Sequence, residues 1–146
     1  MKELTIKSPS FQHNSPIPKK YNCDGEGTNP PLTIEGTPKE SKSIALVVDD
    51  PDAPGGTFDH WVVWNISPST SKIAERSVPG TEGLNSMRKP GYTGPCPPSG
   101  THRYFFKVYA LDTQLTLGAK STKRDLEKAM QGHILAKGEL IGLYHR

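Results

Sequence analysis

The sequence predicts a mainly β fold, an antiparallel, strand-rich domain with one helix packed at one face. Glycine and proline each occur 14 times, so that 28 of the 146 residues break helices, whereas average usage would give about an eighth. Three apolar runs have the length and the β-branched or aromatic content of buried strands. One segment, late in the chain, has the pattern of a helix. These observations exclude a coiled coil and a helical bundle.

Length and charge narrow the class of protein further. A chain of 146 residues has the size of a single domain, spanning residues 1–146, with a real core. Charged residues make up 23% and the net charge is +3, which is too balanced for a disordered tail and too weak for a dedicated nucleic-acid binder. No stretch approaches the ~18 apolar residues of a membrane span, and the N-terminus lacks the apolar region of a signal peptide. We therefore expect a soluble, cytoplasmic protein.

Residues 44–48 are predicted to form a buried strand from their length and β-branched content. Two further strands, residues 60–66 and 102–111, carry large side chains on both faces, as central strands that are covered on both sides do. Pro51 ends the first strand because it has no N–H to donate. Residues 67–101 contain too many prolines and glycines for a long helix, so this connection is either a functional loop or a misassigned region.

The predicted helix covers residues 122–131. Thr122 and Asp125 have the spacing of a capping box, and Gly132 follows as a C-cap. Its apolar stripe consists of Leu126, Ala129 and Met130. A final strand is predicted over residues 139–144, and residues 7–38 are predicted to be short strands and ordered loop.

Polar side chains that could carry chemistry gather at the ends of these strands. They are Asp49, Asp50 and Asp52 after the first strand, Asp59 and His60 at the start of the second, and His102 and Arg103 at the start of the third. If the strands are antiparallel neighbours, the carboxylates and both histidines meet at one rim of the sheet. Histidines with a hydroxyl and backbone N–H groups can bind a small anion, while carboxylates fix the histidine tautomers.

Side-chain alternation assigns these residues to faces. His60 is predicted to share a face with Val62, Trp64 and Ile66. His102 is predicted to share a face with Tyr104, Phe106 and Val108. Each histidine is then the polar residue at the end of a mostly apolar face. Arg103 points to the face opposite that of His102, toward a structural partner.

Each of these features also has a purely structural explanation. Residues 49–54 can be only a turn, because Asp side chains cap turns well, and either histidine alone is more often a hydrogen-bonded strand-end residue. A zinc or manganese site made of Asp50, Asp52, His60 and His102 has acceptable ligand types but no recognised spacing. The motifs of serine hydrolases, phosphate-binding loops and dinucleotide-binding folds are absent from the sequence.

The two cysteines, Cys23 and Cys96, match no zinc-binding spacing. In a reducing cytosol two free thiols are the default, and a disulfide forms only if the fold brings the residues together. A Cys96 nucleophile is disfavoured, because Pro95 and Pro97 place the thiol in a stiff loop and not at a helix N-terminus.

Three motifs follow one another along the chain: residues 49–54 (DDPDAP), 59–66 (DHWVVWNI) and 94–104 (GPCPPSGTHRY). Together they closely resemble the phosphatidylethanolamine-binding protein family, in its short bacterial and archaeal branch. Residues 21–25 and 30–32 resemble the N-terminal signature of that branch. The resemblance covers nearly the whole chain.

This resemblance implies a large antiparallel β-sheet packed against a smaller sheet, with one or two flanking helices. It also implies a small pocket at one end of the large sheet that holds phosphate, acetate or a phosphoethanolamine head group. The pocket residues implied by the motifs are Asp50, Asp52, His60, Pro95, His102 and Tyr104. Pro95 is expected at the mouth of the pocket.

The first functional hypothesis is therefore a non-enzymatic binding protein, without cofactor or bound metal, that holds a small anion and regulates a partner kinase or serine protease. Two alternatives stay open. One is a serine protease inhibitor acting through an exposed loop near residues 76–92, and the other is a metal-assisted phosphoester hydrolase that uses His60 and His102. Bacterial relatives suggest a homodimer.

Overall fold

The computed structural model describes residues 2–146 and consists mainly of two β-sheets. In the large sheet the strands follow the order β1-β10-β9-β5-β6-β8, and β3 pairs with β10. These strands are β1 (Lys2–Glu3), β3 (Ser15–Pro16), β5 (Ser43–Asp50), β6 (Phe58–Ile66), β8 (Thr81–Glu82), β9 (Thr101–Leu111) and β10 (Ile134–His145). The long strands β5, β6, β9 and β10 are antiparallel to their long neighbours, and the short strands β1 and β3 join β10 in parallel.

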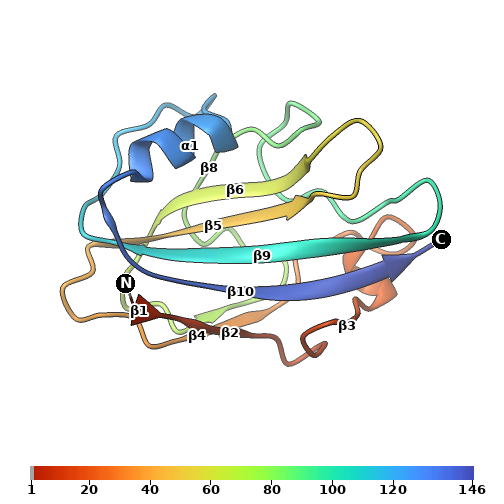
Figure 1. Cartoon of the computed structure of the whole chain (residues 1–146), viewed down its shortest axis with the longest axis horizontal. Helices are drawn as coiled ribbons and strands as arrows, with labels where there is room; N and C mark the ends of the chain where they lie inside the picture. Colours follow the sequence, from red (N-terminus) through yellow and green to blue (C-terminus); the bar gives the residue numbers. More distant parts are fainter. Residues whose placement is uncertain (1) are drawn as a thin grey trace.

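The smaller sheet and the helices complete the fold (Figure 1). The smaller sheet has the order β2-β4-β7. Its strands are β2 (Thr5–Lys7), β4 (Leu32–Glu35) and β7 (Lys72–Ile73). A 3-10 helix, η1 (Lys19–Tyr21), precedes β4, and the helix α1 (Lys123–Met130) lies between β9 and β10 in the chain. The predicted β-rich fold with a large sheet, a smaller sheet and a flanking helix is confirmed.

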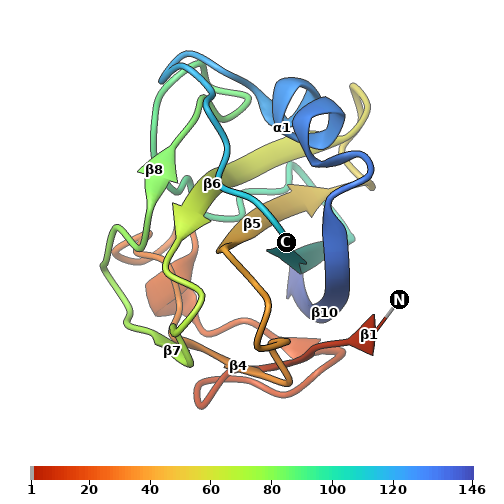
Figure 2. The same cartoon turned by 90° about the vertical axis from the view of Figure 1, so that its left-hand side faces the viewer.

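The large sheet is the middle layer of the molecule, with α1 on one face and the smaller sheet on the other (Figure 2). Between the two sheets, Trp61 and Phe106 pack with Ile34 in one buried cluster. On the opposite face, Trp64 packs against Leu126 of α1 in a second cluster. The central strands are therefore covered on both sides, as their apolar content predicts.

The predicted helix is confirmed, with both of its end signals. The Thr122 N–H donates to the Asp125 carboxylate at 2.9 Å, and the reciprocal contact of the capping box is also present. Gly132 follows with a φ of +79°, a left-handed conformation that glycine adopts without a steric penalty. Across residues 2–146 no helix has the length and apolar character needed to span a membrane.

The last strand is longer than the predicted segment 139–144, because two glycines serve close packing and do not interrupt it. A Cβ at Gly138 would lie 2.1 Å from the Leu4 carbonyl oxygen, and one at Gly142 would lie 2.4 Å from an Ile17 side-chain carbon. Glycine usually weakens a strand, but it also permits another backbone to approach. These glycines allow the N-terminal segments to lie against β10.

Candidate functional site

The end of β5 and the start of β9 lie at the same end of the large sheet (Figure 1). A pocket of about 600 Å³ is lined by residues from these strand ends. Its sheet wall carries Asp50, His60, His102 and Tyr104, four of the six residues implied by the sequence motifs. Loops supply the other walls, through residues 23, 25–27, 53–54, 92–94 and 96–98. Thus the long connection between β6 and β9 is in part a wall of the pocket.

His60 is turned toward this pocket by an irregularity in the pairing of β5 with β6. Val48 pairs with Trp61, whereas Asp49 pairs with Asp59. One step along β5 therefore corresponds to two steps along β6, and His60 is the additional residue of a β-bulge. A bulge bends its strand and redirects a side chain.

The predicted shared face of His60 with Val62 and Trp64 is wrong for this reason. Val62 and Trp64 pack on the side of the sheet that α1 covers, whereas His60 stands against Tyr104, with ring centroids 5.3 Å apart. Ile66, the third residue of the predicted face, lies between the two sheets. Regular alternation thus fails along β6 but holds at the start of β9, where His102 and Tyr104 share a face.

The orientation of the His60 ring follows from its contact with Thr93. Nδ1 of His60 lies 2.7 Å from the Thr93 carbonyl oxygen, which can only accept, so Nδ1 carries the proton. Nε2 is then left on the pocket side without a protein hydrogen bond among the described residues. Burial lowers the pKa of His60, because removal from water disfavours the imidazolium form.

His102 is held in a comparable way by a carboxylate. Its Nδ1 donates to an Asp50 oxygen at 2.6 Å, and both side chains are buried. The other Asp50 oxygen accepts the Asp52 N–H at 2.7 Å. Asp50 therefore fixes the tautomer of the neutral His102 ring, with Nδ1 protonated, and places a negative charge beside it.

Two tyrosine hydroxyls lie near the pocket and differ in their hydrogen bonding. The Tyr92 hydroxyl donates to the Tyr21 carbonyl oxygen at 2.8 Å. The Tyr104 hydroxyl is buried and forms no hydrogen bond with any group of residues 2–146. Burial and the nearby Asp50 carboxylate raise the pKa of Tyr104, so its hydroxyl remains a proton donor. An unpaired buried hydroxyl costs free energy unless a ligand or water completes its hydrogen bond.

Asp52 and Pro95 are not in the pocket wall. The Asp52 carboxylate accepts from the Arg103 guanidinium at 2.8 and 2.9 Å, which agrees with the predicted structural role of Arg103. Pro95 is buried, and its carbonyl oxygen accepts the Cys23 N–H at 3.0 Å. Its chain neighbours Gly94 and Cys96 line the pocket, as do Pro97 and Pro98.

The other strand-end carboxylates serve the opposite face of the sheet. Asp49 is buried and pairs with Lys107 at 3.1 Å and with Lys123 of α1 at 3.3 Å. Lys123 also lies 3.0 Å from Asp59. In residues 2–146 no group of three or more His, Cys, Asp or Glu side chains could hold a metal ion, so the four ligands of the hypothetical zinc or manganese site do not converge.

Cys23 and Cys96 form a disulfide at the pocket, against the default expectation of two free thiols. The pairing joins residues 73 positions apart, a proximity that no local sequence pattern encodes. Both cysteines are exposed and line the pocket. Arg146 lies beside the sulfurs, with Nη1 at 3.2 Å from Sγ of Cys96 and 3.7 Å from Sγ of Cys23.

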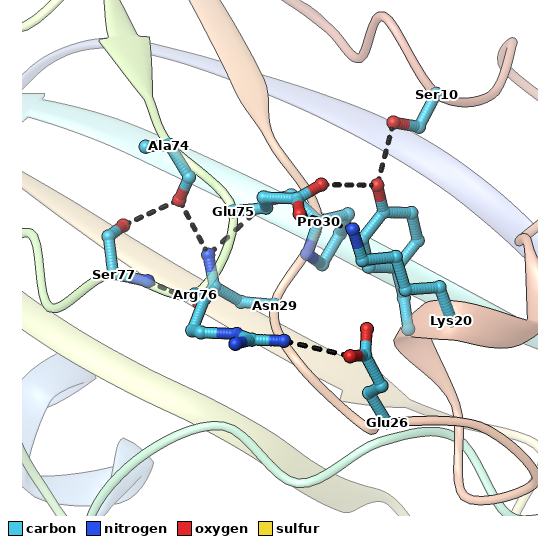
Figure 3. A network of polar contacts seen from close by, with 10 residues as sticks. Ser10, Lys20, Glu26, Asn29, Pro30, Ala74, Glu75, Arg76 and Ser77 are labelled. Atoms are coloured by element: carbon cyan, nitrogen blue, oxygen red, sulfur yellow. Dashed lines mark hydrogen bonds and ion pairs between the residues drawn. The ribbon is translucent and has the colours of Figure 1, made fainter.

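Glu26 and Asn29, which follow Cys23 in the chain, belong to a polar network with residues 74–77 (Figure 3). The Asn29 amide donates to the Ala74 carbonyl oxygen at 3.0 Å and accepts the Ser77 N–H at 2.9 Å. Nearby, Arg76 pairs with Glu26 at 2.9 Å. These contacts hold one loop wall against the connection that follows β7.

Sequence reasoning did not assign the orienting role of Thr93, which acts through its backbone carbonyl. A backbone role leaves no signature in the side-chain type. Nor did it connect Arg146 with the cysteines, because their proximity depends on β10 ending beside Gly100, where Arg146 and Gly100 exchange two backbone hydrogen bonds.

The fold and the pocket agree with the comparisons with known proteins. The family model described as "Phosphatidylethanolamine-binding protein" matches residues 7–145. The chain therefore belongs to the phosphatidylethanolamine-binding protein family, as its motifs suggest.

Particular relatives are similar over their whole length. A UPF0098 protein of Methanothermobacter thermautotrophicus is 46% identical, covering 98% of this chain and 99% of the relative. The crystal structure of a phosphatidylethanolamine-binding protein homologue from Chlamydia trachomatis superposes with a TM-score of 0.96 at 43% identity, over 100% of this chain and 99% of the other. YbcL of E. coli, described as a new member of the mammalian family, gives a TM-score of 0.91 at 28% identity, with 99% of each chain covered.

Proposed function

We propose that this protein is a non-enzymatic binding protein whose pocket holds a small oxyanion, either phosphate or a phosphoethanolamine head group. The observation that carries the proposal is the buried hydroxyl of Tyr104, a residue of the pocket wall, which forms no hydrogen bond within the described part of the chain. His60 and His102 belong to the same wall, and the Nδ1 contacts of both rings leave Nε2 for a ligand. An oxyanion accepts hydrogen bonds from all three groups.

The protonation of the histidines determines how strongly the pocket attracts an anion. Because Nδ1 of each ring donates to a protein oxygen, Nε2 gains a proton only when the ring becomes an imidazolium. A phosphate oxygen near Nε2 favours that form through charge and a hydrogen bond. Binding is therefore expected to take up a proton at His60, and affinity falls as the pH rises above the lowered pKa of the free residue.

Size and wall chemistry favour a head group over a lipid chain. The pocket holds about 600 Å³, and its floor lies on strands. The apolar side chains Phe58, Pro97 and Pro98 stand around the polar groups. This arrangement suits a compact phosphoester whose phosphate meets the histidines.

Regulation of a partner kinase or serine protease is the second part of the proposal and rests on family membership. Inhibition of a protease by a substrate-like loop has weaker geometric support. Proteins bind extended peptide segments by strand addition, whereas Leu84 and Pro90 form a bridge that closes the segment between them. Within this turn Arg88 has a φ of +60°.

A proton NMR titration of the five histidines with phosphoethanolamine tests the pocket. The His60 and His102 signals, assigned from His60→Gln and His102→Gln, are expected to move together in metal-free protein. His133, which pairs with Asp112 and is absent from the pocket wall, is the internal control. If the two signals move only after zinc is added, the hydrolase alternative is favoured, and if neither moves, the proposal is wrong.

A further inference from the structure

The Cys23–Cys96 disulfide has features that a purely structural crosslink does not need. Both residues are exposed and line the pocket. The bond joins two separate loop segments of the pocket lining, residues 23–27 and 94–98. Exposed disulfides are the ones most open to thiol exchange, since a thiolate must reach a sulfur atom.

Arg146 supplies the second feature, a positive charge held beside the sulfurs. Two backbone hydrogen bonds with Gly100, at 2.7 and 3.0 Å, fix its main chain. Its guanidinium lies 3.2 Å from Sγ of Cys96 and 3.4 Å from the Asp24 carboxylate, to which Tyr144 also donates a hydrogen bond. A neighbouring guanidinium stabilises a thiolate, and a more stable thiolate leaves faster in exchange.

We propose that this disulfide is a thiol-exchange site that adjusts the pocket. An external thiolate attacks Sγ of Cys23, the bond to Cys96 breaks, and Cys96 leaves as a thiolate beside Arg146. The second thiol of a dithiol reductant then attacks the mixed disulfide and releases Cys23 as a thiol. Two electrons pass from the dithiol, which becomes a cyclic disulfide, to the protein.

Reduction loosens the pocket without separating its walls completely. The Cys23 N–H still donates to the Pro95 carbonyl oxygen at 3.0 Å, and the Tyr92 hydroxyl still donates to the Tyr21 carbonyl oxygen at 2.8 Å. The lost covalent link allows the two loops to move apart at the mouth. If the pocket binds an anion as proposed above, oxidised and reduced protein bind it with different affinities, and by linkage the ligand shifts the redox equilibrium by the same factor.

The exchange step is tested on the wild-type protein with glutathione, without reference to any pocket ligand. Brief exposure followed by iodoacetamide and peptide mass spectrometry is expected to find glutathione on Cys23 and carbamidomethyl on Cys96. Glutathione mainly on Cys96, or a disulfide that survives excess dithiothreitol in the folded protein, would overturn the assignment.

The role of Arg146 is tested with Arg146→Gln, and Arg124→Gln on the exposed face of α1 removes the same charge elsewhere. In reduced protein the pH midpoint for alkylation of Cys96 is expected below the ~8.5 of a free cysteine. Arg146→Gln should raise this midpoint and slow reduction several-fold, and Arg124→Gln should change neither. Equal behaviour of the two variants would contradict the role of Arg146.

The effect on the pocket is measured by calorimetry with inorganic phosphate. Oxidised protein is expected to bind about five-fold or more tightly than reduced protein, within the usual range of coupling between sites. Equal affinity in the two states overturns the coupling to the pocket. Absence of phosphate binding by the oxidised protein instead overturns the proposed function, and the glutathione experiment then decides the exchange site alone.

Discussion

His60 and Tyr104 face each other across the pocket wall, with ring centroids 5.3 Å apart, because β6 carries one more residue than the paired stretch of β5. Without this bulge the imidazole would point toward the helix side, with Trp64. The site is therefore assembled by a local break in strand regularity. A strand end with a bulge is a common way to aim a functional side chain.

The first prediction concerns the unpaired hydroxyl of Tyr104. Tyr104→Phe removes a buried group without a partner, so the free energy of unfolding should stay equal or rise. Phosphate affinity should fall about ten- to hundred-fold, since a hydrogen bond to a charged group contributes roughly 1.5–3 kcal/mol. Calorimetry and urea unfolding measure the two effects.

Tyr92→Phe is the matched control for this substitution. Its hydroxyl already donates to Tyr21, so its removal should lower the free energy of unfolding by about 1 kcal/mol and leave a buried carbonyl short of a partner. Thus Tyr92→Phe should lower the free energy of unfolding, whereas Tyr104→Phe should leave it equal or raise it. A loss of stability in Tyr104→Phe as large as that in Tyr92→Phe would mean that the Tyr104 hydroxyl has a protein partner.

The second prediction is the pH dependence of anion binding at His60. Burial lowers the pKa of this residue in the free protein, and a bound anion raises it. Affinity should therefore rise as the pH falls from 7 and level off below the pKa of the free protein, by at most about ten-fold per pH unit for one proton. Sulfate is the suitable probe, because its own charge is constant over this range.

His60→Gln should flatten this pH profile, whereas His133→Gln, at an exposed ion pair outside the wall, should leave it intact. A wild-type profile that is flat between pH 5 and 8 would contradict a binding mode based on imidazolium.

The sequence was sufficient for the part of the site that follows regular strand geometry. Asp50 and His102 stand at paired strand ends, and alternation correctly places His102 with Tyr104. The face of His60 was not predictable, because a bulge depends on the register between two strands. The Cys23–Cys96 contact likewise depends on the closure of distant loops.

Asp52 illustrates a different limit of sequence reasoning. Its place in the DDPDAP motif favoured a pocket role. Arg103, however, stands one residue beyond His102 on the other face of β9, and its guanidinium donates to the Asp52 carboxylate. Neighbouring residues of a strand point to opposite sides. A motif therefore identifies which residues gather at a strand end and not which of them share the pocket.

The third prediction concerns Asn65, which marks the second irregularity of β6. Asn65 has a φ of +53°, and its amide exchanges two 2.8 Å hydrogen bonds with the backbone of Leu115. Asn65→Ala loses both bonds and strains the left-handed backbone, so we expect a loss of about 2–3 kcal/mol in unfolding free energy. Asn65→Gly loses the bonds alone and should be about 1 kcal/mol more stable than the alanine variant. Chemical denaturation of both variants provides the measurement, and a glycine variant less stable than the alanine variant would refute the backbone argument.

The fourth prediction is an acid-dependent contribution from the Asp52–Arg103 pair. Hydrogen bonds from Arg103 lower the pKa of Asp52 to about 2, below its value of 3.8 in the unfolded chain. Since the folded-state pKa is the lower one, the stabilisation is complete above pH ~4 and is lost as the pH falls toward 2. The pair is partly exposed, so solvent screening limits its contribution to about 1 kcal/mol.

Asp52→Asn should therefore lower the free energy of unfolding by that amount at pH 6 and by almost nothing near pH 2, as measured by urea titration at each pH. Glu40→Gln, at an exposed position, controls for the loss of one charge, and an equal pH dependence of stability in both variants would show that the Arg103 contact contributes nothing in solution.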